Sequence, residues 1–247
     1  MCYNVAMIRA VLFDFSGTLA DCGEQWWRLE LTTTVSAPLE LLHTRGLLSL
    51  GNGDIEKADS LYTGMQRQAK ETGIEISAHE AVRQAVAALK LNVPAMTLDA
   101  TVDELFRACL PDVAPLDGAA AMLAQLKSRR LVLAVISNAR HGRFVHWALR
   151  RLNLERFFHT IVVSADVQLR KPRPEIFWNT LNELAIAPAE AAYVGDYYPY
   201  DMVGARAAGM RSIWLRTPDK PPSDLPADAV ISGLDELPRV MDTLSRT

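Results

Sequence analysis

The stretch IRAVLFDFSGT (residues 8–18) decides the fold class. Its first six residues are apolar except for Arg9, and the run stops abruptly at the acid Asp14 and a polar turn. A short apolar run that ends in this way is typical of a buried parallel strand that leads into a functional loop. We therefore expect a strand over residues 8–13, with Asp14 at its carboxyl end.

Four later segments repeat this pattern and alternate with helical segments. Alternation at this spacing predicts right-handed crossovers and a parallel sheet with helices on both faces, which is a doubly wound α/β fold. The expected strands span residues 131–136, 160–163, 191–196 and 212–215, and the expected helices about 118–129, 141–151, 174–185 and 199–209.

The segment from about residue 25 to 112 has a helical pattern instead. Three stretches place apolar residues on one face, and Ser77–Glu80 and Thr101–Glu104 have the spacing of capping boxes that open the last two helices. No strand is expected there. We therefore predict a catalytic core of residues 1–20 and 113–247, interrupted by an all-helical domain of residues 21–112.

Composition limits the classes of partner. The chain has 247 residues, of which 49% are hydrophobic, and a formal net charge of -3, so we expect no binding to nucleic acid or to an anionic membrane surface. Five arginines form a local basic cluster that we interpret as a solvated helix face: Arg140, Arg143, Arg150, Arg151 and Arg156.

Cysteines and targeting signals point to a cytoplasmic protein. Three scattered cysteines make no disulfide framework, and we expect Cys22 to be chemically inert. The N-terminus has no basic region before its apolar run, and no run approaches the ~18 apolar residues of a membrane span. Residues 217–226 form a loop rich in Pro and Asp.

Polar residues follow three of the expected strands. They are Asp14, the pair Ser137 and Asn138, and Asp196. Ligands of open parallel sheets bind beyond the carboxyl ends of the strands, so these side chains should converge on one site. Lys171 and a second acid, Asp201, complete the set.

Four motifs in this order resemble those of the haloacid dehalogenase (HAD) superfamily. They are FDFSGT (13–18), VISN (135–138), RKPRPEIF (170–177) and VGDYYPYD (194–201). The resemblance implies a Rossmann-like core, and it identifies the helical insertion as a cap of the type that closes over small substrates. The activity it implies is hydrolysis of a small phosphorylated molecule, for which Asp14 is the covalent nucleophile.

A phosphate monoester is a dianion, so a carboxylate nucleophile beside it needs positive charge. Asp14 and Asp196 offer hard oxygen ligands to Mg²⁺, and the resemblance adds the backbone carbonyl of Ser16. We assign Asp201 to the same metal site, where it would orient metal-bound water. Lys171 would offset the charge of Asp14 and of the phosphoryl oxygens.

The phosphoryl group itself is expected to be held by a second set of residues. Ser137 and Asn138 would bind it with nearby backbone N–H groups, and Gly17 and Thr18 would give the backbone room to approach it. Trp26 and Trp27 could line the pocket or belong to the core of the cap.

The pattern departs from the family at Ser16. Most phosphatases that it resembles carry there an Asp that protonates the leaving alcohol and then activates water. A hydroxyl cannot replace a group whose usual contribution is ~10²–10⁴-fold. Three alternatives stay open: a phosphatase that is slow, limited to good leaving groups or given an acid by the cap; a phosphonatase-type carbon–phosphorus hydrolase; and a binding protein without turnover.

The second alternative needs a cap lysine to form a Schiff base, and the chain offers Lys57, Lys70 and Lys90. Dehalogenases also lack the second Asp but need no metal. An acid at Asp196 facing Asp14 without a cation would cost repulsion, which favours Mg²⁺. The sequence makes no prediction about the oligomeric state.

Overall fold

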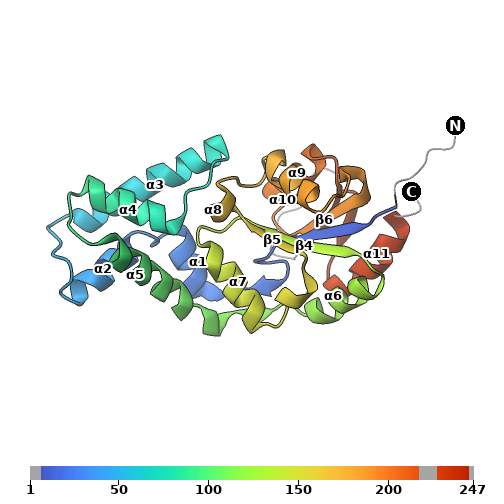
Figure 1. Ribbon diagram of the computed structural model, residues 1–247, viewed down its shortest axis with the longest axis horizontal. Coiled ribbons are helices and arrows are strands. Elements are labelled where there is room, and N and C mark those ends of the chain that lie inside the picture. The colour runs from blue at the N-terminus through green and yellow to red at the C-terminus, as the bar shows by residue number, and fades with distance from the viewer. Residues whose placement is uncertain (1–6, 217–226, 245–247) are drawn as a thin grey trace.

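The structure is a computed structural model that describes residues 7–216 and 227–244 (Figure 1). The predicted loop at residues 217–226 lies outside these ranges. At the centre is one sheet of six parallel strands in the order β5-β4-β1-β6-β7-β8. The predicted α/β fold with a parallel sheet is confirmed. The strands are β1 (Ala10–Phe13), β4 (Val132–Ser137), β5 (Thr160–Val163), β6 (Ala191–Gly195), β7 (Arg211–Leu215) and β8 (Ala229–Ile231).

Helices cover both faces of this sheet because successive side chains of each strand point to opposite sides. On β1, Val11 and Phe13 pack into one cluster and Ala10 and Leu12 into the other. Helices α6, α7 and α11 cover the first face, and α9 and α10 the second (Figure 1). Their bounds, with those of α8, are α6 (Ala119–Ser128), α7 (Gly142–Arg151), α8 (Ser164–Val167), α9 (Pro174–Glu183), α10 (Tyr198–Ala207) and α11 (Leu237–Leu244).

Five helices form a block beside one end of the sheet, at the left of Figure 1. The chain leaves the core through β2 (Ala20–Asp21) and returns through β3 (Ala114–Pro115), and these two short strands pair antiparallel. The two connections therefore lie side by side. The helices are α1 (Gly23–Leu31), α2 (Ser36–Thr44), α3 (Asp54–Thr72), α4 (Ala78–Ala88) and α5 (Ala95–Ala108).

Short 3₁₀ turns join several of these elements: η1 (Leu110–Asp112), η2 (Glu155–Phe157), η3 (Pro188–Glu190) and η4 (Leu234–Glu236). Strand β8, near the C-terminus, was not predicted. Three residues are too few to show a strand pattern.

One of the two predicted helix starts is correct. Ser77 caps α4, where its hydroxyl accepts a hydrogen bond of 3.2 Å from the backbone N–H of Glu80. The start at Thr101 is wrong, because α5 begins at Ala95 and Thr101 lies inside it, donating to the carbonyl of Thr97. Pro94 is the physical reason, since a proline is pre-set for a helix start and residue 94 precedes α5 directly.

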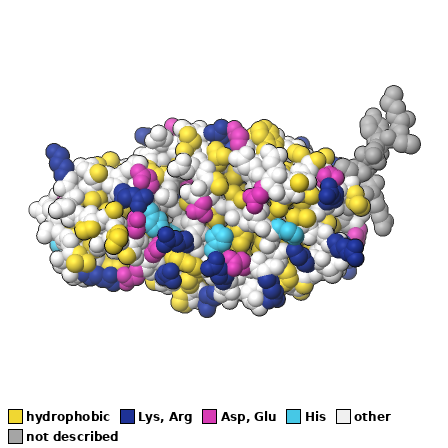
Figure 2. All heavy atoms as spheres, viewed as in Figure 1, with side chains coloured by type: hydrophobic (Ala, Val, Ile, Leu, Met, Phe, Trp, Pro, Cys, Tyr) yellow, Lys and Arg dark blue, Asp and Glu magenta, His cyan; other side chains and the backbone are white. Residues whose placement is uncertain are grey.

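The basic cluster is only partly the solvated face that we expected. Arg143 and Arg150 are exposed, and Figure 2 shows cationic side chains interspersed with acidic and apolar ones on the visible face. Arg140 contradicts the expectation, because only 4% of it is exposed and it pairs with Glu30 of α1. Among the described residues, no helix is both long and apolar enough to cross a bilayer.

Candidate active site

The carboxyl ends of the central strands meet at a cavity of about 410 Å³. Asp14 follows β1, Ser137 ends β4 and Asp196 follows β6, so the core side of this cavity is built from three adjacent strands. The helical block contributes the opposite wall. The residues lining it from that block are Trp26, Trp27, Glu30, Leu31, Gln66, Lys70 and Glu75, and those from the core include Arg140, Arg170, Tyr197 and Tyr200.

Lys171 lies at the centre of the charged groups and is only 1% exposed. Its ammonium donates to Asp14 Oδ1 at 2.8 Å, to Asp201 Oδ1 at 2.7 Å and to the hydroxyl of Tyr193 at 2.8 Å. Burial acts against its charge, yet the neighbouring Asp14 and Asp201 raise the pKa of Lys171 above its usual value. This lysine is therefore a fixed cation beside Asp14.

Three carboxylates surround that single ammonium. One oxygen from each of Asp14, Asp196 and Asp201 lies within 4.8 Å of the others. Burial, opposed by Lys171 and supported by the charge of Asp14, raises the pKa of Asp201 to about 6. The cluster thus holds more negative charge than Lys171 balances, and its hard oxygen donors fit a divalent cation such as Mg²⁺.

The two oxygens of Asp201 have protein partners. Oδ1 accepts from Lys171, and Oδ2 accepts from the backbone N–H of Tyr197 at 2.9 Å. These bonds fix the carboxylate and suit a residue that orients the site. A Cβ on Gly195 would collide with the carboxyl of Asp201, so this position requires the bare backbone of glycine.

The turn after β1 holds the second acid in place. The Thr18 hydroxyl donates to Asp196 Oδ1 at 3.0 Å, and a Cβ on Gly17 would stand 2.5 Å from Asp196 Oδ2. Gly17 also has a φ of +82°, a conformation that glycine adopts without strain. Both residues position Asp196, and the phosphate contact we expected of them stays a prediction.

The side chain of Asn138 holds the backbone of Lys171. Its side-chain oxygen accepts from the backbone N–H of Lys171, and its side-chain nitrogen donates to the Lys171 carbonyl, both at 2.9 Å. The adjacent Ser137 is 3% exposed and lines the cavity. Binding of a phosphoryl group by Ser137 and Asn138 also stays a prediction.

Ser16 lines the same cavity, and its buried hydroxyl has no hydrogen-bond partner among the described residues. Cys22 lies close to it, and burial raises the pKa of that thiol to about 12, an effect that Ser16 partly offsets. A buried thiol that stays protonated is unreactive. The expectation that Cys22 is inert agrees with this environment.

Sequence reasoning missed several residues at or beside this cavity. Tyr193 is a buried side chain of β6 behind the lining, whose hydroxyl accepts from Lys171 and donates to the Ile136 carbonyl. Glu30 and Glu75 pair across the wall with Arg140 and Arg170. One signal was available, because Glu30 lies on the same helical face as the apolar Trp26 and interrupts it.

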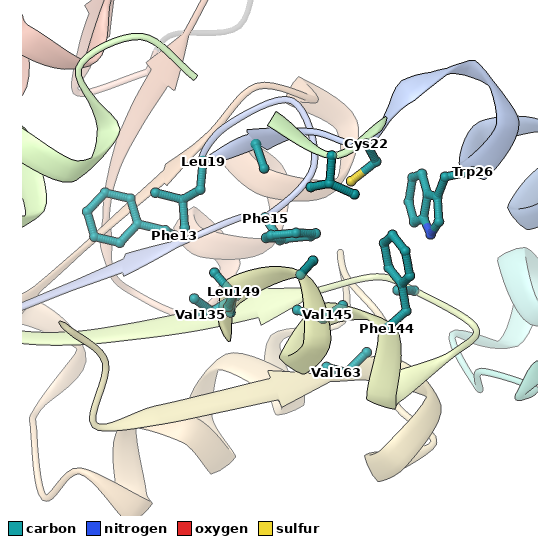
Figure 3. Close-up of a cluster of buried hydrophobic side chains, with 14 of the residues drawn as sticks. Phe13, Phe15, Leu19, Cys22, Trp26, Val135, Phe144, Val145, Leu149 and Val163 are labelled. Carbon is teal, nitrogen blue, oxygen red and sulfur yellow. The ribbon is translucent and has the colours of Figure 1, made fainter. Parts of the chain in front are cut away.

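Both tryptophans line the cavity, in agreement with one of the two interpretations. Trp26 is 2% exposed and stacks on Phe144 of α7, with ring centroids 5.5 Å apart (Figure 3). Trp27 is 41% exposed. Trp26 therefore also belongs to the packing between the block and the core, whereas Trp27 is free to meet a ligand.

A second cluster of possible metal ligands lies between the helical block and the core. Asp103 Oδ1 is 2.9 Å from His79 Nε2 and 2.8 Å from His141 Nε2, and Arg143 binds its other oxygen. His141 Nδ1 accepts from the backbone N–H of Phe144 at 3.0 Å, so the ring proton is on Nε2. With that nitrogen donating to Asp103, the cluster is satisfied without a metal.

Comparison with known proteins places this geometry in a family. Residues 55–215 match the protein family that is described as haloacid dehalogenase-like hydrolase. The chain is 30% identical over 218 residues to a glyceraldehyde 3-phosphate phosphatase of Methanopyrus kandleri, a match that covers 85% of this chain and 84% of the relative. A phosphoserine phosphatase of Thermus thermophilus is 36% identical over 97 residues, which is 39% of each chain.

Solved structures share the fold over nearly the whole chain. A 2-haloacid dehalogenase from Pseudomonas syringae has a TM-score of 0.70 at 24% identity, covering 96% of this chain and 99% of that one. A HAD phosphatase from Thermococcus onnurineus has a TM-score of 0.66 at 21% identity, covering 95% and 98%. The chain is therefore an enzyme of the haloacid dehalogenase-like hydrolase family.

Proposed function

We propose that this protein is a Mg²⁺-dependent phosphatase of a small phosphorylated molecule and that it acts through an aspartyl-phosphate on Asp14. One observation carries the proposal: Lys171 Nζ lies 2.8 Å from Asp14 Oδ1 inside a group of three carboxylates. A carboxylate held by a buried ammonium at the edge of a ligand-sized cavity is equipped to attack a phosphorus atom.

Asp14, Asp196 and the carbonyl of Ser16 would hold the magnesium ion. When bound, it would neutralise the charge that Lys171 leaves unbalanced, so that a phosphate dianion can enter. The residues of the chain do the rest. Lys171 binds and orients Asp14, and Thr18 and Asp201 hold the neighbouring side chains in position.

The reaction has two steps at the same carboxylate. In the first, an oxygen of Asp14 bonds to phosphorus as the bond from phosphorus to the leaving oxygen breaks. In the second, water attacks the aspartyl-phosphate, which releases inorganic phosphate and restores Asp14. The hydroxyl of Ser137 and nearby backbone N–H groups would bind the phosphoryl oxygens in both steps.

The cavity supports a small substrate. Its volume of about 410 Å³ is at the low end of ligand sites. Two of the similar proteins are named a glyceraldehyde 3-phosphate phosphatase and a phosphoserine phosphatase, and both names specify small phosphorylated substrates. We propose that residues 21–112 act as a cap. Closure of this block would exclude water from the aspartyl-phosphate.

Carbon–phosphorus hydrolysis is the second candidate, because one cap lysine, Lys70, lines the cavity. Lys57 is exposed and pairs with Asp54 instead. A Schiff base on Lys70 would be trapped by borohydride in the presence of a carbonyl phosphonate. No trapping is expected from a phosphatase.

The test is a screen of phosphorylated metabolites and phosphonates with Mg²⁺ and with excess EDTA. We expect turnover of at least one phosphate monoester with Mg²⁺ and background rates with EDTA. Undiminished turnover in EDTA would contradict the metal assignment. Tight Mg²⁺-dependent binding without turnover would favour a binding protein.

A further inference from the structure

Unpaired polar atoms gather around the cavity above Asp14. Across the described ranges, five buried side-chain nitrogen or oxygen atoms have no hydrogen-bond partner. Four of the five belong to residues that line this cavity: Ser16 Oγ, Trp26 Nε1, Glu30 Oε2 and Arg140 Nε. Each unpaired buried group costs about 1–3 kcal/mol, so their concentration at one place indicates groups reserved for a ligand.

Glu30 is the acid in this set, and the helix that bears it is packed firmly against the core. Cys22, Trp26 and Glu30 are four residues apart, so they share one face of α1 and its N-cap. Trp26 of this face stacks on Phe144, as Figure 3 shows. Only 3% of Glu30 is exposed, and its carboxyl contacts the backbone N–H of Arg140, which follows β4. The carboxyl therefore lies between the helical block and the strand ends.

The two oxygens of the Glu30 carboxyl differ. Oε1 accepts from the backbone N–H of Arg140 at 2.7 Å and from its guanidinium at 3.3 Å, whereas Oε2 has no partner. A neutral carboxyl with its proton on Oε2 would keep both bonds to Oε1 and would present an O–H to the cavity side. An ionised Oε2 would leave a charged oxygen buried and unpaired, which is costly.

The charged groups around Glu30 shift its pKa in opposite directions. Burial raises the pKa of Glu30, Arg140 and Arg170 lower it, and Glu75 raises it. Tyr62 donates its hydroxyl to the Glu30 carbonyl. A carboxyl in such surroundings changes its protonation state nearer to neutral pH than an exposed glutamate does, as a general acid must.

Glu30 and Ser16 line the same cavity as Asp14. The negative charges of both Asp14 and Glu30 raise the pKa of the buried Cys22 thiol, so both carboxylates lie near that thiol. A substrate whose phosphorus lies at Asp14 would therefore occupy a cavity that Glu30 also lines.

We propose that Glu30 supplies the proton that Ser16 cannot. The inference rests on the proposed phosphatase function. In the first step, Glu30 Oε2 gives its proton to the leaving oxygen as that oxygen separates from phosphorus, so an alcohol departs. In the second, the Glu30 carboxylate takes a proton from the water that attacks the aspartyl-phosphate, and the acid is regenerated. Because Oε2 is buried in the structure, the proposed proton transfer requires the leaving group to enter the cavity between α1 and the strand ends.

The experiment compares leaving groups. Purified Glu30→Gln is assayed with Mg²⁺ on nitrophenyl phosphate, whose leaving group needs no proton, and on a glycerol phosphate, whose leaving group needs one. We expect kcat/KM for the glycerol phosphate, which reports the step that releases the leaving group, to fall by ~10²–10⁴-fold, and kcat/KM for nitrophenyl phosphate to change only a few-fold. The second step is common to both substrates and does not enter kcat/KM. A purely structural role would lower both values of kcat/KM alike.

Glu75→Gln is the matched control. Glu75 is a buried glutamate of the same cavity that pairs with Arg170 at 3.5 Å and accepts from Ser164 at 3.0 Å. Its substitution should change the ratio of the two kcat/KM values far less than Glu30→Gln does, because Glu75 acts on Glu30 only through its charge. If Glu30→Gln does not fold because Arg140 is left unpaired, the double variant Glu30→Gln/Arg140→Met removes both charges and gives the same ratio test.

A second variant sharpens the result. Ser16→Asp in the Glu30→Gln background should restore turnover of the glycerol phosphate, whereas Ser16→Asp in the wild type should add little. An unchanged ratio in Glu30→Gln, with turnover that still depends on Asp14, overturns the inference alone. Nitrophenyl phosphate turnover that survives Asp14→Asn refutes the proposed function, and the inference with it.

Discussion

Two clusters of potential metal ligands can be compared within this chain. Asp14, Asp196 and Asp201 meet at the strand ends, and His79, Asp103 and His141 meet between the helical block and the core. In each cluster the candidate ligand atoms lie within 4.8 Å of one another. Proximity alone therefore does not distinguish them.

Charge and hydrogen bonding distinguish the two clusters. Among the described residues, the strand-end cluster has three carboxylates and one buried ammonium, so its acids outnumber its cations. The other has a single carboxylate, Asp103, bound by two imidazoles and by Arg143. The first cluster suits the cation proposed above, whereas the hydrogen bonds of the second are satisfied. Unbalanced charge is the better sign of a metal site.

The largest expected effect separates the two clusters by activity. Asp14→Asn should lower turnover to background, a loss on the order of 10⁶-fold, because the amide cannot attack phosphorus. Asp103→Asn should leave kcat/KM within a few-fold of the wild type. Steady-state rates on the best substrate of the screen measure both. Equal losses in the two variants would mean that the second cluster also serves the reaction.

Lys171→Met should have the next largest effect. The variant removes the cation that holds Asp14 and leaves an excess of negative charge, for which we expect a loss of ~10²–10³-fold in kcat. Arg143→Met, which removes the cation of the second cluster, is the control and should change kcat little. Near wild-type rates for Lys171→Met would show that the motif RKPRPEIF (170–177) has another role.

The second cluster should instead control stability against acid. Burial lowers the pKa of His141 to about 4, with the charges of His79 and Arg143 acting in the same direction. The unfolded chain binds this proton at about pH 6.5, so the contribution is fully present above that pH and is lost as the pH falls toward 4.

Denaturant unfolding at several pH values measures this effect. The free energy of unfolding should fall by up to about 1.4 kcal/mol per pH unit between pH 6.5 and 4 in the wild type. His141→Gln should flatten the slope, and His159→Gln, at an exposed position, should not. An equal slope in all three proteins would contradict the assignment.

The smallest expected effect is that the buried cysteines of the native protein, one of which lies near the first cluster, do not react with an alkylating reagent. Burial raises the pKa of Cys22 to about 12 and that of Cys109 to about 11. Native protein treated with iodoacetamide at pH 8 should therefore stay unmodified at both residues, and unfolded protein should react at both. Peptide mass spectrometry reads the two states. Rapid native labelling of Cys22 would show an open path to the nucleophile loop.

The sequence predicted the central strands and the residues at their ends because both depend on local patterns. The central strands are short apolar runs bounded by polar turns, and the residues at their carboxyl ends had to meet because the strands are parallel. Asp14, Lys171 and Asp201 are in contact as these patterns suggested. Their catalytic roles remain proposals.

What sequence reasoning missed depends on contacts between distant segments. The pair of Glu30 and Arg140 joins residues 110 positions apart, and neither has an unusual neighbour in the chain. Arg140 was interpreted as solvated because it stands in a run of arginines, yet the block of helices covers it. The predicted helix start at Thr101 was wrong for a local reason, because the helix already starts directly after Pro94, ahead of the capping pattern of Thr101.

The central claim is that phosphoryl transfer passes through Asp14. The most direct measurement mixes the enzyme with Mg²⁺ and nitrophenyl phosphate, quenches in acid within one turnover, and locates the added phosphoryl group by peptide mass spectrometry. We expect it on Asp14 in the wild type, and we expect no phosphorylated peptide from Asp14→Asn. A phosphoryl group on any other residue, or full turnover without a phosphorylated enzyme, would contradict the account.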